Sequence, residues 1–148
     1  MSLNEETVLL SRIPIFKNID ASKLKLLAFT SDRLRFPSGQ NLFRQGDRGD
    51  SAYIILSGEA DVIVERTDGQ VSIARLGKHE LIGEIAILID VPRTATVRAV
   101  TEVTALEISK EPFLRMITQF PEIGIEVMRE LAHRLVRTTA RLGDPESG

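Results

Sequence analysis

One stretch of the chain decides the fold, and it reads Ile82-Gly83-Glu84-Ile85-Ala86-Ile87-Leu88-Ile89-Asp90-Val91-Pro92-Arg93-Thr94-Ala95-Thr96-Val97-Arg98-Ala99. It inserts about one helical turn between two regions of β-like sequence. A glycine ahead of a short helix lets backbone N–H groups point at an anion, and the helix dipole adds to that attraction. An arginine at the same place supplies a planar pair of donors that suits phosphate oxygens. The segment from Gly83 to Arg93 therefore predicts a phosphate cradle.

Glu84 stands one residue after the glycine, where it would repel a phosphate. Its carboxylate can instead accept hydrogen bonds from sugar hydroxyls, so an acid beside a phosphate cradle indicates a ribose phosphate ligand. The alternative is a buried ion pair between Glu84 and Arg93 that serves only the fold. Burying both charges without a ligand is costly and rarely stabilises a protein.

The residues around this stretch have the pattern of a β protein. Short β runs are expected at 41–44, 52–56, 59–65, 71–76, 94–100 and 103–108. Glycines stand between these runs and can supply the positive φ of tight turns. Thr67-Asp68-Gly69-Gln70 predicts a hairpin turn, because Asp-Gly is favoured where both central residues have φ above zero. Strands of this length and spacing predict a sandwich, jelly roll or barrel.

Both ends of the chain have helical spacing. Residues 5–30 predict two or three short helices broken at Pro14 and at the 18–20 turn, with Asp20 or Ser22 as an N-cap. A short helix over 111–119 precedes a longer one from Pro121, at position N1, to about Leu142. The expected class is α+β, mainly β: an antiparallel β-roll or jelly roll with flanking N-terminal helices, a short cassette helix and two C-terminal helices.

Length and composition bound the functions that the chain can have. It has 148 residues, no cysteine and a formal net charge of -2. These values predict one domain over residues 1–143 in a cytoplasmic protein, with a disordered tail over 144–148 that has no apolar side chain. No signal peptide and no membrane span are expected. A pI near 5.7 argues against direct nucleic-acid binding, which depends on Lys and Arg.

The motif Gly83-Glu84-Ile85-Ala86, followed after a short gap by Arg93-Thr94-Ala95-Thr96-Val97-Arg98-Ala99, resembles the phosphate-binding cassette of the cyclic nucleotide-binding domain family. That family includes the bacterial catabolite activator and the regulatory parts of cyclic-nucleotide-dependent kinases and channels. The likeness runs from roughly Leu10 to Leu142, with Ile82 where the family often has Phe. It implies a non-catalytic module that binds cAMP or cGMP, needs no metal and closes its C-terminal helices over the base.

The resemblance also implies roles for single residues. Arg93 would bind the cyclic phosphate and Glu84 would accept from the ribose 2′-hydroxyl. Gly83, Ile85, Ala86 and Ala95 would form the close wall of the site, through backbone N–H groups or close approach. Thr94 could meet a guanine amino group or a phosphate oxygen, which leaves the choice between cAMP and cGMP open.

Two further residues of the final helix are candidates for base recognition. Thr138 and Thr139 fall where the catabolite activator has a Thr-Ser pair that contacts adenine. The other interpretation is that both hydroxyls bond to the preceding turn of their own helix. The sequence does not separate these two interpretations.

The final helix also carries an apolar stripe and a set of arginines. The stripe can bury against the β-roll, which is the simpler expectation, or against a second copy in a two-fold homodimer. It consists of Met128, Leu131, Ala132, Leu135, Thr139 and Leu142. The arginines alternate with Glu126 and Glu130, so they are expected on a solvated face. They are Arg129, Arg134, Arg137 and Arg141.

Two alternatives concern the function of the chain, and a third concerns its organisation. The pocket could be vestigial or bind another small acid, as in a scaffold or a transcription-regulator-like sensor. A jelly-roll metal enzyme is the second, but His79 and His133 are the only histidines and have no ligand partner at close spacing. The third concerns organisation, since only six residues follow Leu142. The chain is either a free-standing sensor with an unknown effector protein or part of a longer chain with an effector domain.

Overall fold

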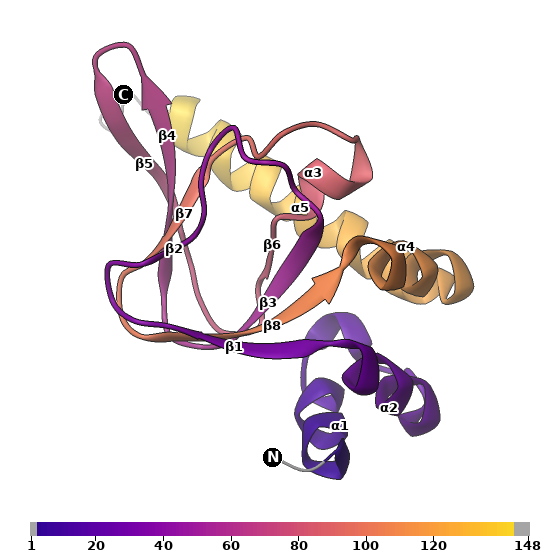
Figure 1. Ribbon diagram of the computed structural model, residues 1–148. Coiled ribbons are helices and arrows are strands. Elements are labelled where there is room, and N and C mark those ends of the chain that lie inside the picture. Colours follow the sequence, from indigo (N-terminus) through magenta and orange to yellow (C-terminus); the bar gives the residue numbers. More distant parts are fainter. Residues whose placement is uncertain (1–2, 144–148) are drawn as a thin grey trace.

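The computed structural model describes residues 3–143, and it contains two four-stranded antiparallel sheets folded against each other as a roll (Figure 1). One sheet has the strand order β1-β8-β3-β6 and the other β2-β7-β4-β5. The strands are β1 (Asp32–Phe36), β2 (Asn41–Phe43), β3 (Ser51–Ser57), β4 (Ala60–Arg66), β5 (Gly69–Leu76), β6 (Leu81–Ile82), β7 (Thr96–Ala99) and β8 (Val103–Ser109). The expected mainly β, antiparallel architecture is confirmed.

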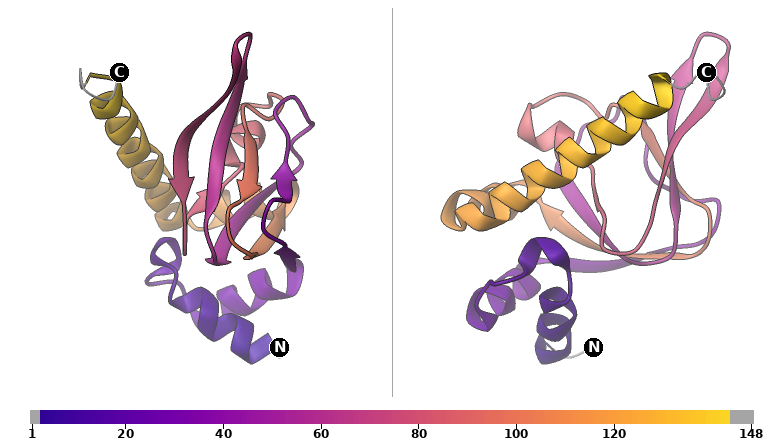
Figure 2. Two further views of the ribbon diagram at one scale, coloured as in Figure 1. Left: turned by 90° about the vertical axis from the view of Figure 1, so that its left-hand side faces the viewer. Right: turned by 180° about the vertical axis from the view of Figure 1, so that it is seen from behind.

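Helices flank the roll at both chain ends, and one short helix lies within it (Figure 2). They are α1 (Leu3–Ser11), η1 (Pro14–Phe16), α2 (Ala21–Thr30), α3 (Glu84–Leu88), α4 (Lys110–Gln119) and α5 (Pro121–Gly143). Asp20 is the N-cap of α2, as expected, but its side chain makes no capping hydrogen bond. Its backbone carbonyl instead accepts from the N–H groups of Lys23 and Leu24, at 3.0 and 3.1 Å.

The strand predictions hold for most of the roll. A hairpin turn does join β4 to β5, but its two central residues are Thr67 and Asp68, because Arg66 pairs with Gly69. Asp68 does not have a positive φ, so the predicted turn with Asp68 and Gly69 at its centre is wrong by one residue. Two strands were missed. β1 has the sequence DRLRF, in which charged residues mask the β pattern, and β6 has only 2 residues. β7 is shorter than the predicted run and begins at Thr96.

The apolar core has two compartments on opposite faces of the β1-β8-β3-β6 sheet. Successive side chains of a strand point to opposite faces. On β3, Ala52 and Ile54 therefore join the cluster beneath the helices, whereas Tyr53 and Ile55 point into the roll. This sheet is covered on both sides, and the end of the roll near Tyr53 is where α3 and the cassette lie.

Helix α5 packs on the domain through a row of side chains that shares Leu131 with the predicted stripe. Ile123 and Val127 are buried, and Leu131 packs on the same cluster. Met128 and Leu135 are 62% and 67% exposed, so the expectation that the stripe packs on its own domain is wrong for these two. The inward row repeats at every fourth residue and includes Leu131 of the stripe, whereas the described stripe residues Met128, Ala132, Leu135 and Thr139 are exposed.

Candidate ligand-binding site

The cassette begins at Gly83, the residue before α3. Gly83 has φ 83°, the left-handed region that glycine adopts at little cost. A Cβ at this position would lie 2.5 Å from Nη1 of Arg93, so a larger residue would collide with that side chain. Glycine here serves both the turn into α3 and the close approach of the arginine.

Arg93 is held inside the protein by backbone oxygens. Its side chain is only 5% exposed, Nη1 donates to the carbonyl of Gly83 at 2.7 Å and Nη2 donates to the carbonyl of Ser51 at 2.7 Å. The guanidinium lies 4.0 Å from the ring centroid of Phe43, a cation–π contact. Among the described residues, nothing accepts from its buried Nε. The arrangement leaves one donor of a charged, fixed guanidinium for an anionic ligand.

Burial lowers the pKa of Arg93, and the nearby phenol of Tyr53 and the carboxylates of Asp50, Glu84 and Asp47 oppose that effect. An arginine stays protonated in proteins at neutral pH because its ordinary pKa is above 12. Arg93 therefore remains a cation, with acidic groups around it and no carboxylate bonded to it.

Glu84, the first residue of α3, is 1% exposed. It does not pair with Arg93. Its Oε1 accepts instead from Nη1 of Arg134 on α5, at 2.9 Å. Burial raises the pKa of Glu84, and the charge of Arg134 opposes the rise. The hypothesis of a Glu84–Arg93 ion pair is therefore wrong, and so is the interpretation of Arg134 as part of a solvated face.

Arg134 also links α5 to the edge strand β6 by hydrogen bonds. Its Nη2 donates to Glu130 at 3.1 Å and to the carbonyl of Leu81, and the N–H of Leu81 donates to Glu130 at 3.2 Å. The Arg134 side chain is 22% exposed. Two charged residues one turn apart on α5 thus satisfy both backbone groups of one residue in β6, next to the cassette.

These groups surround one cavity of about 80 Å³. It is lined by Phe43, Val62, Leu76, Ile82, Gly83, Glu84, Ile85, Ala86, Arg93, Thr94, Ala95, Val97 and Arg134. Seven of the predicted site residues meet here, and they are Gly83, Glu84, Ile85, Ala86, Arg93, Thr94 and Ala95. Thr139 is exposed and does not line the cavity, and the side chain of Thr138 lies outside the described part of the chain.

Several residues of the site were not found from the sequence. Phe43 and Ser51 come from β2 and β3, far from the motif, and Ser51 acts through its backbone carbonyl, which any residue could supply. Gly49 is close-packed against the cassette, since a Cβ there would collide with Ala86 and lie 3.1 Å from Arg93. The sequence signal that could have indicated this contact is the pair of glycines, Gly46 and Gly49, around Asp47.

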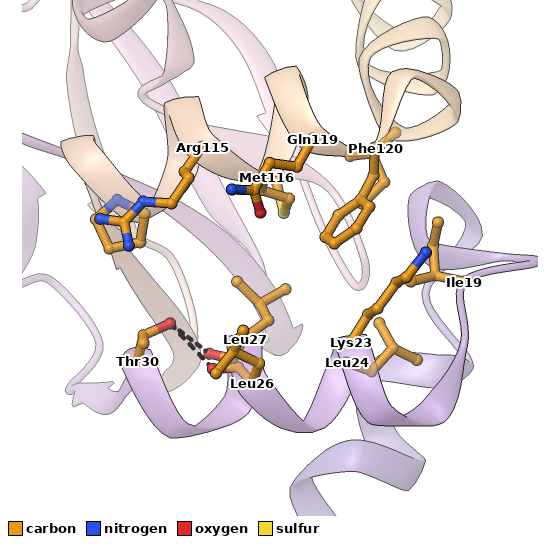
Figure 3. Close-up of a pocket in the computed structure, with 12 residues that line it drawn as sticks. Ile19, Lys23, Leu24, Leu26, Leu27, Thr30, Arg115, Met116, Gln119 and Phe120 are labelled. Carbon is orange, nitrogen blue, oxygen red and sulfur yellow. Dashed lines mark hydrogen bonds between the residues drawn. The ribbon is translucent and has the colours of Figure 1, made fainter.

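A second hollow lies away from the cassette, between α2 and α4 (Figure 3). Its volume is about 60 Å³, and most of its lining is apolar. The hydroxyl of Thr30 donates to carbonyls of its own helix, and Lys23 lies 4.7 Å from the ring centroid of Phe120. No carboxylate lines it. Its lining includes neither Arg93 nor Glu84, and it lies between α2 and the bend from α4 to α5.

Residues 3–143 contain neither a cluster of metal-ligating side chains nor a helix suited to cross a membrane. No group of three or more His, Asp or Glu side chains there comes together as a metal site. None of the helices in this range is long and apolar enough to cross a bilayer.

The sequence matches one known protein family over more than half of its length. Residues 33–120 match the model of the cyclic nucleotide-binding domain. The chain belongs to this family. The match spans β1 to the end of α4 and includes the whole cassette.

Relatives of the chain include a transcriptional regulator. The chain is similar to a CRP-like cAMP-activated global transcriptional regulator from Mycobacterium tuberculosis, with 32% identity over 137 residues, which is 92% of this chain and 61% of that protein. The chain thus spans about three fifths of the length of this curated relative.

Two solved structures have the same fold. The catabolite activator protein of Thermus thermophilus is 28% identical, with a TM-score of 0.75, over 87% of this chain and 61% of that one. The regulatory subunit of a cAMP-independent protein kinase A from Trypanosoma brucei is 26% identical, with a TM-score of 0.74, over 88% and 47%.

Proposed function

We propose that this domain binds a cyclic nucleotide, cAMP or cGMP, and passes the binding event to an effector by moving its C-terminal helices. The observation that carries the proposal is Arg93, a buried cation fixed by two carbonyls with an unpartnered Nε beside Glu84 and a cavity. A buried charged donor without an acceptor is costly, and a phosphate would supply that acceptor.

The ligand would lie along the cassette. Arg93 would bind the cyclic phosphate, Glu84 would accept from the ribose 2′-hydroxyl, and Thr94 would lie beside the phosphate. Gly83, Ile85, Ala86 and Ala95 would form the wall, since all four line the cavity with Arg93. Thr138 and Thr139 remain candidates for contact with the base.

The small size of the cavity supports the proposed movement of α5. Its volume is about 80 Å³, whereas pockets for small molecules usually have at least about 300 Å³. Arg134 fills the side next to Glu84, so a nucleotide would have to displace it or share Glu84 with it. Ligand then shifts the equilibrium of α5 only as far as it binds one position of the helix more tightly than the other.

Calorimetry with cAMP and cGMP on the same sample tests ligand identity, affinity and stoichiometry together. At about 100 times its dissociation constant, a ligand adds about 2.7 kcal/mol of stability, which a thermal-shift titration detects. Arg93→Ala is expected to lose several kcal/mol of binding while the fold persists. Arg66→Ala, at an exposed residue, is the matched control. No heat and no shift with cAMP, cGMP or a cyclic dinucleotide would refute the proposal.

A different small acidic ligand is the alternative. The name of the Trypanosoma brucei relative, a regulatory subunit of a cAMP-independent kinase, favours it, since a domain of this fold can belong to a protein described as independent of cAMP. Arg93 and Glu84 are both present here and favour a ribose phosphate. The alternative predicts that Arg93→Ala changes cyclic nucleotide binding little, because there is little to lose.

The context of the domain is also proposed. We expect a regulatory, non-catalytic unit over residues 1–143 in a cytoplasmic protein that acts through an effector protein or domain, without direct nucleic-acid contact by this domain. The predicted tail over 144–148 lies outside the described residues. We further propose a two-fold homodimer through α5, on the exposed row that includes Met128 and Leu135.

A further inference from the structure

Glu107 on β8 is a half-buried glutamate on the strand face that also carries Val103 and Ala105. Tyr53 on β3 is directly opposite it in the sheet register. Its Oε2 accepts from the hydroxyl of Tyr53 at 2.8 Å and from Oγ of Ser51 at 3.1 Å. One oxygen of Glu107 therefore accepts hydrogen bonds from two residues of the neighbouring strand. Ser51 and Tyr53 are two positions apart on β3, so their side chains lie on the same face.

This acid lies among apolar side chains. Ala105 and Val103, which precede it on the same face of β8, are fully buried, and Tyr53 is 6% exposed. A carboxylate in such surroundings is costly unless it is hydrogen-bonded. Burial raises the pKa of Tyr53, and Glu107 adds to the rise. The phenol thus stays protonated at neutral pH and remains a hydrogen-bond donor to Glu107.

Two chains of contacts lead from Glu107 to Arg93. The first runs through Ser51, whose hydroxyl donates to Glu107 and whose carbonyl accepts from Nη2 of Arg93 at 2.7 Å. The second runs through two rings. Tyr53 stacks on Phe43 with centroids 5.9 Å apart and an interplanar angle of 27°, and the guanidinium of Arg93 lies 4.0 Å from the centroid of Phe43.

We infer that Glu107 is a positioning residue for the anion site: by fixing Ser51 and Tyr53 it sets where Arg93 points. The inference rests on the proposed function, in which Arg93 binds the phosphate. Among the described contacts, Glu107 makes no direct hydrogen bond or ion pair with Arg93. It acts through the hydrogen bonds and ring contacts that end on the guanidinium.

The experiment titrates the full chain with cAMP and cGMP by calorimetry in a set of variants. Glu107→Ala removes both acceptor bonds, and Glu107→Gln keeps one acceptor oxygen. Glu65→Ala is the matched control, because Glu65 is an exposed glutamate in the other sheet. In the described part of the chain its carboxylate accepts a hydrogen bond from the side chain of Gln70. Tyr53→Phe and Ser51→Ala each remove a single donor and leave the strand intact, so they serve if Glu107→Ala does not fold.

Glu107→Ala is expected to weaken nucleotide binding roughly tenfold and Glu107→Gln roughly threefold, the range of one buried hydrogen bond or less. Tyr53→Phe and Ser51→Ala should lie between these values and the wild type. The control Glu65→Ala should bind as the wild type does. A Glu107→Ala or, if that does not fold, a Tyr53→Phe that binds with unchanged affinity would overturn the inference.

A double-mutant cycle with Arg93→Ala distinguishes positioning from a general loss of structure. If Glu107 acts through Arg93, adding Glu107→Ala to Arg93→Ala lowers the residual affinity less than twofold, because the residue it positions is gone. The full tenfold loss in that background would overturn the inference. Failure of the wild type to bind any cyclic nucleotide would instead refute the proposed function, so the two failures are distinct.

Discussion

Arg134 on α5 and Glu84 at the start of α3 are separated by 50 residues in the chain, and their side chains meet at 2.9 Å. This is the contact that joins the C-terminal helix to the cassette. Glu84 is 1% exposed, and Arg134 is the cation that forms an ion pair with it among the described residues. The consequences of the pair can be measured in stability and in its pH dependence.

Removing Arg134 is expected to destabilise the protein. Arg134→Ala leaves a buried carboxylate without its ionic partner, which costs about 1–3 kcal/mol. Arg137→Ala, on the exposed side of the same helix, should change the free energy of unfolding by less than about 0.5 kcal/mol. Urea denaturation of both variants measures the difference. Equal losses in the two would show that Glu84 does not need Arg134.

The pH dependence of stability should carry the signature of Glu84. Burial raises its pKa in the folded protein above that of an unfolded glutamate, about 4.3. The folded state therefore holds this proton more readily. Its contribution to stability is fully present below the unfolded value and is lost as pH rises through the folded pKa.

Glu84→Gln removes this titration. The free energy of unfolding of the wild type minus that of the variant is expected to fall as pH rises from about 4 towards neutrality. Urea unfolding curves at several pH values over that range measure it. A difference that stays constant or grows with pH would contradict the expectation.

Close packing of the cassette predicts an unequal effect of two similar glycine substitutions. Gly49→Ala places a methyl group against Ala86 and 3.1 Å from Arg93, and overpacking of this kind costs about 1–3 kcal/mol. At Gly77 the nearest atom to an added Cβ is 3.9 Å away, so Gly77→Ala is the control. Differential scanning calorimetry should show a lower Tm for Gly49→Ala alone. Similar Tm values would show that the cassette can yield by a small movement.

The outer row of α5 predicts a homodimer. Ile125, Met128 and Leu135 are exposed large apolar side chains, and with Ala132 and Thr139 they repeat at spacings of three and four residues. Leu135→Glu is expected to give a monomer. Arg137→Glu, off the row, should leave the dimer intact. Light scattering measures both, and a wild-type monomer at saturating nucleotide would end the dimer proposal.

The sequence predicted the parts of the site that depend on local residues. The glycine, the acid and the arginine of the cassette lie within one segment, so their spacing alone brings Gly83, Glu84 and Arg93 to one place. The strands of the roll were predicted where apolar and polar residues alternate. β1, with the sequence DRLRF, was missed although its last four residues alternate, because two apolar residues, Leu34 and Phe36, are a short signal.

The rest depends on contacts between distant parts of the chain. Nothing in the local pattern distinguishes Arg134 from Arg137, since both belong to a charged helix with nearby glutamates. Only the docking of α5 through Ile123 and Val127 decides that Arg134 faces Glu84. Ser51 holds Arg93 by a carbonyl, which leaves no trace in residue type. Glu107 likewise appears as an ordinary polar residue of a strand until its pairing with Tyr53 is known.

The anchoring of Arg93 has a kinetic consequence. A free arginine side chain loses up to about 2 kcal/mol of rotamer entropy when it is immobilised. Here the carbonyls of Gly83 and Ser51 impose that loss when the chain folds. Capture of an anion therefore needs no rearrangement of the residue that receives it. Under the proposed function, the slow step would belong to the opposite wall, where the ligand displaces Arg134 or shares Glu84 with it. The lifetime of the docked helix, rather than the search for the phosphate, would then set the association rate.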